Sequence, residues 1–160
     1  APAFPDELYR EAMQKAEQQG FHSADKFRLI RGGTYELLHR ATAALVTSGT
    51  ATLETALFGV PQIVCYYIPL GPVIRLARRL FLKVPYISLV NLVCGREVVP
   101  ELVASDMNAA RLTPALRSIL PGGEARDSQL KGYAEMRRLL GEPGAPQHAA
   151  REMVEILHRK

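Results

Sequence analysis

The feature that most constrains the fold is an apolar run that turns into a helix through three small residues. Residues 43–46 are all apolar, and Thr47 ends the run. Such a run is expected of a parallel strand that is buried on both faces. Ser48-Gly49-Thr50 follows, and apolar side chains then recur at helical spacing until Gly59-Val60-Pro61 ends the pattern. A second β-rich run at residues 62–67 completes a strand–helix–strand unit. This order predicts an α/β fold with a parallel sheet.

The other segments extend this pattern with further helices and strands. Helices are predicted at residues 6–19, before Gly20, at residues 34–40, where Thr34 is a candidate cap, and from Arg96 onward, with breaks at 121–123 and 141–146. Strands are predicted at residues 27–30 and 86–89. The chain opens on a helix where a doubly wound domain would already contain strands, so we expect a fragment of a longer protein. Residues 1–104 should form an incomplete Rossmann-like parallel sheet, and residues 105–160 a helical tail packed on the same domain.

Composition excludes several classes of protein. The chain has 160 residues, of which 48% are hydrophobic and 22% charged, as in an ordinary globular domain. It contains neither an apolar stretch long enough for a transmembrane helix nor the pattern of a signal peptide. The two cysteines, Cys65 and Cys94, lack metal-ligand spacing and are expected to be reduced thiols. The four histidines also lack such spacing, so we expect no metal. Aromatic residues are not interleaved with basic ones, which argues against nucleic-acid binding.

The turn after the first buried strand is the first candidate binding site. Gly49 lets a ligand approach the backbone closely, and the N–H groups at a helix start favour a diphosphate. The hydroxyls of Ser48, Thr50 and Thr52 can bond phosphate oxygens, and the Glu54 carboxylate can accept both hydroxyls of a ribose. The same residues also suit a helix start without a ligand, because Ser and Thr are common caps and an early Glu complements the helix dipole. Spacing alone leaves both interpretations open.

A second candidate site follows the strand predicted at residues 86–89. Asn91 would lie at the carboxyl end of that strand, where open α/β sheets bind ligands. Arg96 comes directly after Gly95 and can bind a diphosphate with its planar guanidinium. The alternative is that Asn91 is a turn residue and that Arg96 forms a surface ion pair with Glu101.

Residues 72–83 carry four cations and no acidic residue: Arg75, Arg78, Arg79 and Lys83. These cations fall near one face of a predicted helix whose other positions are mostly apolar. Such a helix can lie on an anionic membrane surface. It can equally pack on the core with a solvated basic face.

Taken together, these runs resemble the lipid-A-disaccharide synthase family. The resemblance is carried by residues 48–54 with Gly59-Val60-Pro61, by residues 76–80 and 83–89, and by Asn91-Leu92 with residues 95–102, all in order and at matching spacing. It continues more loosely to Tyr133–Arg137. Val90 departs from the pattern, since family members usually carry Pro before the Asn.

The resemblance implies a GT-B glycosyltransferase with two Rossmann-like halves, of which this chain would be the donor half. The implied reaction transfers diacylglucosamine from UDP-2,3-diacylglucosamine to the 6-hydroxyl of diacylglucosamine 1-phosphate, inverts the anomeric centre, releases UDP and needs no metal or other cofactor. Ser48, Gly49, Thr50 and Thr52 would contact the diphosphate, Glu54 the ribose, and Asn91 and Arg96 would be polar groups near the donor. The implied location is the cytoplasmic face of the inner membrane of a Gram-negative bacterium.

The amino-terminal acceptor half, which would hold the general base, is expected to be missing, so the chain alone should be inactive. Its incomplete sheet makes a homo-oligomer or strand-swapped dimer an expected partner state. Two other functions remain open. The chain could be a non-catalytic UDP- or nucleotide-sugar-binding module, or a membrane-surface interaction domain.

Overall fold

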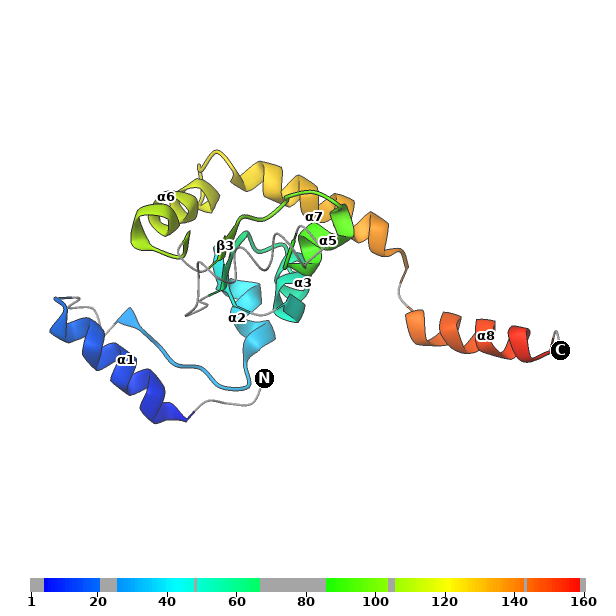
Figure 1. Ribbon diagram of the computed structural model, residues 1–160, viewed down its shortest axis with the longest axis horizontal. Helices are drawn as coiled ribbons and strands as arrows, with labels where there is room; N and C mark the ends of the chain where they lie inside the picture. The colour runs from blue at the N-terminus through cyan, green and yellow to red at the C-terminus, as the bar shows by residue number, and fades with distance from the viewer. Residues whose placement is uncertain are drawn as a thin grey trace, which may run out of the picture. The chain divides into compact units, whose positions relative to one another are not determined.

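A computed structural model describes residues 5–20, 26–47, 49–66, 86–103, 106–142 and 144–158 (Figure 1). Ser48 and the basic stretch with Arg75, Arg78, Arg79 and Lys83 lie outside the described residues. The chain divides into two compact units, Ala1–Glu36 and Leu37–Lys160.

The first unit contains helix α1 (Asp6–Gln18), which confirms the helix predicted before Gly20. An ion pair joins Asp6 to Arg31. The strand predicted at residues 27–30 is wrong, because these residues belong to no strand and Phe27 is 65% exposed. A strand requires a neighbour that supplies its ladder hydrogen bonds, and the sheet takes no segment from this unit.

The second unit is built on a parallel three-stranded sheet in the order β1-β2-β3. Its strands are β1 (Ala44–Val46), β2 (Gln62–Tyr66) and β3 (Glu101–Val103). Leu45 pairs with Ile63, and Cys65 pairs with Leu102. The α/β class and the parallel sheet predicted from the strand–helix–strand pattern are confirmed, and the sheet is that of an incomplete Rossmann-like fold. β1 is an edge strand, so Leu45 remains 49% exposed.

The strand predicted at residues 86–89 is wrong, and the third strand lies further along the chain at β3. Helix α5 (Leu89–Cys94) begins instead, with Ser88 as its cap: the Ser88 hydroxyl accepts a hydrogen bond from Asn91 N at 3.2 Å. Gly95, with a φ of 64°, ends the helix in the left-handed conformation that favours glycine. Asn91 is therefore a helical residue, and no strand lies in the described residues 86–90 before it.

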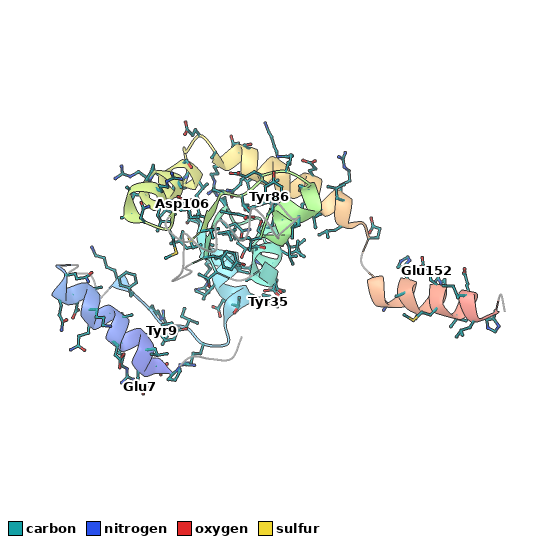
Figure 2. All side chains as sticks on the ribbon, viewed as in Figure 1. Glu7, Tyr9, Tyr35, Tyr86, Asp106 and Glu152 are labelled. Atoms are coloured by element: carbon teal, nitrogen blue, oxygen red, sulfur yellow. The ribbon has the colours of Figure 1, made fainter. Side chains whose placement is uncertain are left out.

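Helices cover both faces of the sheet. Besides α5, these are α3 (Gly49–Leu57), α6 (Ala109–Ile119) and α7 (Arg126–Leu140). The described chain also contains α2 (Thr34–Arg40), which begins in the first unit, and α8 (Ala145–His158). Asn108 caps α6 by accepting a hydrogen bond from Arg111 N at 3.1 Å. Among the described residues, α8 buries no side chain between Gln147 and His158; Glu152 is labelled in Figure 2. No helix in the described part of the chain is long and apolar enough to cross a bilayer.

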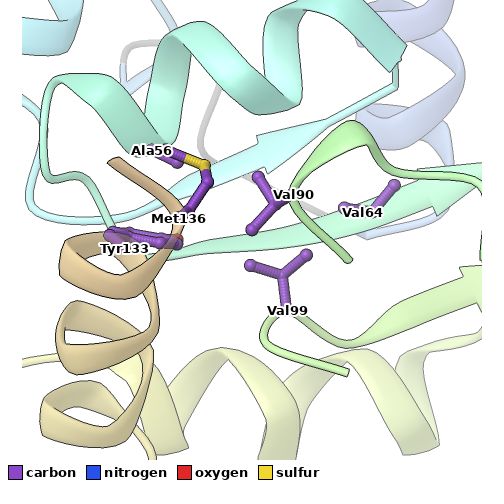
Figure 3. Close-up of a cluster of buried hydrophobic side chains, with 6 residues drawn as sticks. All are labelled: Ala56, Val64, Val90, Val99, Tyr133 and Met136. Carbon is purple, nitrogen blue, oxygen red and sulfur yellow. The ribbon is translucent and has the colours of Figure 1, made fainter. Parts of the chain in front are cut away.

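Alternation along β2 divides the core into two clusters. Val64 points to one face, where it joins Ala56 of α3, Val90 of α5 and Met136 of α7 (Figure 3). Ile63 and Cys65 point to the other face, where the cluster also contains Leu102 and Ile119 of α6. Successive residues of a strand face opposite sides, so one short strand organises both layers. Helices α3, α5 and α7 therefore share one side of the sheet, and α6 takes the other.

Both cysteines are free thiols, as expected. Cys65 is buried and Cys94 is half-buried. Burial raises the pKa of each thiol above its ordinary value, which favours the protonated form of both at neutral pH.

Gly132 permits the close packing of α7 on the segment before β3, and this packing can be tested. A methyl group at position 132 would overlap Val98 Cγ1 and lie 3.2 Å from Val98 Cγ2. Glycine-to-alanine in a helix ordinarily stabilises by about 1 kcal/mol, whereas overpacking costs about 1–3 kcal/mol. We expect Gly132→Ala to lower the free energy of unfolding in urea titrations.

The Val98→Ala variant provides the control, because it removes the methyl groups that would be struck. The double variant should be more stable than the sum of the two single effects by about 1 kcal/mol or more. Additive effects would show that the two residues are not packed as described.

Candidate functional site

The carboxyl edge of the sheet carries most of the first predicted site. Helix α3 starts two residues after Thr47, and Gly49 and Thr50 are its first two residues. Thr50 is exposed and Glu54 is half-buried. Residues four apart lie on the same helix face, so Thr50 and Glu54 form one surface beside the helix start. No described residue donates a hydrogen bond to the Glu54 carboxylate, which leaves its oxygens available as acceptors.

Thr52 lies in the same turn but faces the interior. Its side chain is completely buried. The hydroxyl donates a hydrogen bond to Gly49 O at 2.6 Å and accepts one from Leu89 N at 3.2 Å. Leu89 is the first residue of α5, so Thr52 links the start of α3 to the start of α5. In this geometry the Thr52 hydroxyl positions the turn, and its contact with a diphosphate remains a prediction.

Glu101 holds the segment that precedes α5. Its carboxylate accepts hydrogen bonds from Ile87 N, from Ser88 N and from Asn91 Nδ2, each at 2.9 Å. The two backbone N–H groups lie just before α5 and have no partner in that helix. The ion pair predicted between Arg96 and Glu101 is wrong, because Glu101 serves these three donors and Arg96 pairs with Glu135.

Asn91 is completely buried, and its amide is fully engaged. Nδ2 donates to Val99 O at 2.8 Å and to Glu101. Oδ1 accepts from Val98 N at 2.7 Å and from Val99 N at 2.9 Å. An amide has two donors and two acceptor lone pairs, so this side chain has no capacity left for a ligand in this geometry. Its part in a nucleotide site remains a prediction, and the contacts favour an indirect, positioning role.

Arg96 lies away from the α3 turn. It follows the carboxyl end of α5, is exposed, and its guanidinium pairs with Glu135 on α7. That hydrogen bond raises the pKa of Arg96. The same helix α7 contacts Val60 and Leu57, which precede β2. Arg96 thus lies at the amino edge of the sheet, whereas Gly49 and Thr50 lie at the carboxyl edge. The structure therefore does not bring Arg96 together with the predicted binding residues of α3.

A buried polar network that the sequence did not reveal fixes β2 against α7 and α3. Gln62 N donates to Gln129 Oε1 at 2.8 Å, and Gln129 Nε2 returns a bond to Gln62 O at 3.0 Å. Gln62 Nε2 donates to Thr52 O at 2.8 Å. Tyr133 donates to Gln129 Oε1 at 2.8 Å, and burial raises the pKa of its hydroxyl. In the sequence, the only sign of this network is that a polar residue, Gln62, begins the otherwise apolar strand β2.

The Tyr-x-Glu-x-Arg pattern near the end of the match has a structural role. Tyr133 lies in the core, and Glu135 pairs with Arg96. Arg137 donates to Leu57 O at 2.5 Å, one of the carbonyls left without an intrahelical partner at the end of α3. The three residues anchor α7 to the rest of the unit.

Comparison with known proteins identifies the family. The model of the family described as Lipid-A-disaccharide synthetase matches residues 6–152. The chain belongs to this family. The predicted resemblance is therefore confirmed, and the motif residues described above are those of a lipid-A-disaccharide synthetase relative.

Curated relatives agree with this assignment. The chain is 41% identical over 129 residues to the lipid-A-disaccharide synthase of Myxococcus xanthus (strain DK1622). These 129 residues are 81% of this chain and 33% of that protein. It is 36% identical over 136 residues to that of Anaeromyxobacter sp. (strain K), covering 85% and 35%. For Syntrophus aciditrophicus (strain SB) the identity is 42% over 123 residues, covering 77% and 32%. The chain spans about a third of the length of these relatives.

For this member of the lipid-A-disaccharide synthetase family, the described residues contain no group of three or more His, Cys, Asp or Glu side chains placed to hold a metal ion. The described residues at the start of α3 offer backbone donors, the exposed Thr50 hydroxyl and the half-buried Glu54 carboxylate. Such an arrangement suits the binding of an anion and a polyol.

The buried contacts of Asn91 lead to a pH-dependent test. Asn91→Asp keeps the acceptor for Val98 N and Val99 N but places a second carboxyl group beside Glu101. Like-charge repulsion and burial raise the pKa of the new carboxyl in the folded state. A group whose pKa is raised on folding stabilises the protein when protonated, so the variant should lose stability as pH rises from about 5 to 8.

Asn108→Asp is the matched control, because the same substitution there adds a carboxylate to an exposed helix cap. A carboxylate at a helix N-terminus has a lowered pKa, so its contribution is present at neutral pH and lost as pH falls. Between pH 5 and 8 the Asn108→Asp variant should therefore keep a constant difference from the parent in urea unfolding, whereas the difference for Asn91→Asp should grow as pH rises. A constant difference for both variants would contradict the role of Asn91.

Proposed function

We propose that this chain is the donor-binding part of a lipid-A-disaccharide synthase, and that the carboxyl edge of its sheet binds UDP-2,3-diacylglucosamine. The observation that carries the proposal is the start of α3, which follows the parallel strand β1 after two residues. A glycine and an exposed threonine lie there, with the Glu54 carboxylate one turn further on the same face. Membership of the family supplies the substrate class.

In this proposal the diphosphate lies against the first turn of α3. The N–H groups there have no intrahelical acceptor and carry the positive end of the helix dipole, so they favour an anion. Gly49 leaves the backbone open to the ligand, and Thr50 adds a hydroxyl donor. Glu54 accepts the two hydroxyls of the ribose, since a carboxylate has room for both. Ser48 would complete the diphosphate contacts.

The proposed whole reaction transfers the diacylglucosamine from this donor to the 6-hydroxyl of diacylglucosamine 1-phosphate, with inversion and release of UDP. The chain's own part is to hold the leaving diphosphate, whose developing charge the helix start stabilises. The acceptor and the general base are assigned to the part of the relatives that this chain does not span. The chain alone should therefore bind the donor without catalysing transfer. Membrane contact through Arg75, Arg78, Arg79 and Lys83 remains a prediction, as does a position on the inner membrane.

Calorimetric titration of UDP into the chain tests the proposal. The parent should give saturable heat, and Glu54→Ala should weaken binding about tenfold or more, because hydrogen bonds to a charged group contribute about 1.5–3 kcal/mol each. Glu124→Ala, at an exposed site between α6 and α7, should leave the affinity unchanged.

A ligand lacking one ribose hydroxyl separates the proposed contact from a general charge effect. The loss caused by Glu54→Ala should shrink for 2′-deoxy-UDP, since one of the two hydrogen bonds is already absent. An equal loss of affinity for both ligands would show that Glu54 does not contact the ribose. Absence of UDP binding by the parent would refute the donor site.

A further inference from the structure

Tyr66 lies at the same edge of the sheet as the start of α3 and belongs to none of the sequence motifs. Tyr66 is the last residue of the central strand β2 and pairs in register with Val103 of β3. It therefore stands at the carboxyl end of the sheet, where parallel α/β sheets bind ligands.

The hydroxyl of Tyr66 lies beside the first residue of α3. A methyl group built on Gly49 would be 3.9 Å from Tyr66 Oη, which is an ordinary van der Waals separation. The turn after β1 and the end of β2 thus present polar groups to one small region. Because Gly49 has no side chain, nothing from that residue stands between the hydroxyl and the helix start.

The ring of Tyr66 is anchored, and its hydroxyl is available. The half-buried ring packs against the core cluster that contains Ala56, Val64 and Val90. Within the described ranges, no residue forms a hydrogen bond with Oη. Tyr133 differs on this point, because its single O–H is donated inside the protein, to Gln129 Oε1 at 2.8 Å or to Val60 O at 3.1 Å.

The electrostatic surroundings keep the phenol neutral. Burial raises the pKa of Tyr66, and the nearby Glu101 carboxylate raises it further. A neutral phenol is a hydrogen-bond donor, and a donor held by packing before the ligand arrives loses little conformational entropy on binding.

We infer that Tyr66 is a further binding residue of the donor site, donating a hydrogen bond from Oη to a non-bridging oxygen of the diphosphate held at the start of α3. The inference rests on the proposed function and adds a contact to it. Its consequence is that the diphosphate is held from two sides, by the backbone of α3 and by the end of β2.

The test compares Tyr66→Phe with the parent in NMR titrations, which follow weak binding, using UDP and uridine as the two ligands. Tyr66→Phe should bind UDP about tenfold more weakly, as expected when a donor to a charged oxygen is lost, and should bind uridine as the parent does. Thermal unfolding should be little changed, because the ring and its packing remain.

Tyr133→Phe is the matched control, since it removes a phenol hydroxyl that is bonded inside the protein. It should lower the melting temperature and leave the affinity for UDP unchanged. A parent that binds UDP and a Tyr66→Phe variant that binds it equally well would overturn this inference alone. Equal weakening for UDP and uridine would also overturn it, because the hydroxyl would not contact the diphosphate. A parent that does not bind UDP would overturn the donor site and this inference with it.

Discussion

The second unit depends on the hydrogen bonds that the Glu101 carboxylate accepts. This carboxylate sits on the first residue of β3 and accepts hydrogen bonds from the chain just before α5 and from Asn91 within that helix. Asn91 in turn holds the backbone of Val98 and Val99, which leads into β3. Glu101 is half-buried, and removing a carboxylate from water is costly unless hydrogen bonds replace the lost water contacts, so the acid and these donors stabilise one another. The result is a closed loop that fixes α5 against the sheet.

These hydrogen bonds also explain how the carboxyl edge of the sheet can hold a fixed geometry for a ligand. With α5 fixed, Leu89 N meets the Thr52 hydroxyl, and Thr52 ties the start of α3 to it. On the other side, Gln62 holds the Thr52 carbonyl from β2. The first turn of α3 is thereby supported through buried contacts, while Thr50 and Glu54 stay accessible. Positioning residues lie beneath the surface, and the residues proposed to bind lie on it.

The same division explains which predicted site residues stand together. Gly49, Thr50 and Glu54 belong to one helix, so their proximity follows from local spacing. Arg96 is separated from them because α5 crosses from the carboxyl edge of the sheet to the amino edge, and its pairing with Glu135 occurs there. A family motif can therefore contain binding residues and residues that hold the fold, without any difference in sequence pattern between them.

The sequence by itself determined the parallel strand–helix–strand unit, the helices α1 and α2, and the family. These follow from local signals: apolar runs, helical spacing, and glycine or proline at the ends. It did not determine that residues 86–89 lead into a helix, because the deciding partner, Glu101, lies more than a turn away along the chain and acts only through space. It also did not indicate β3, whose three residues are too short for a recognisable pattern. The burial of Asn91, the Gln62–Gln129 pair and the approach of Tyr66 to Gly49 were decided by tertiary structure, since each joins segments whose contact no local periodicity encodes.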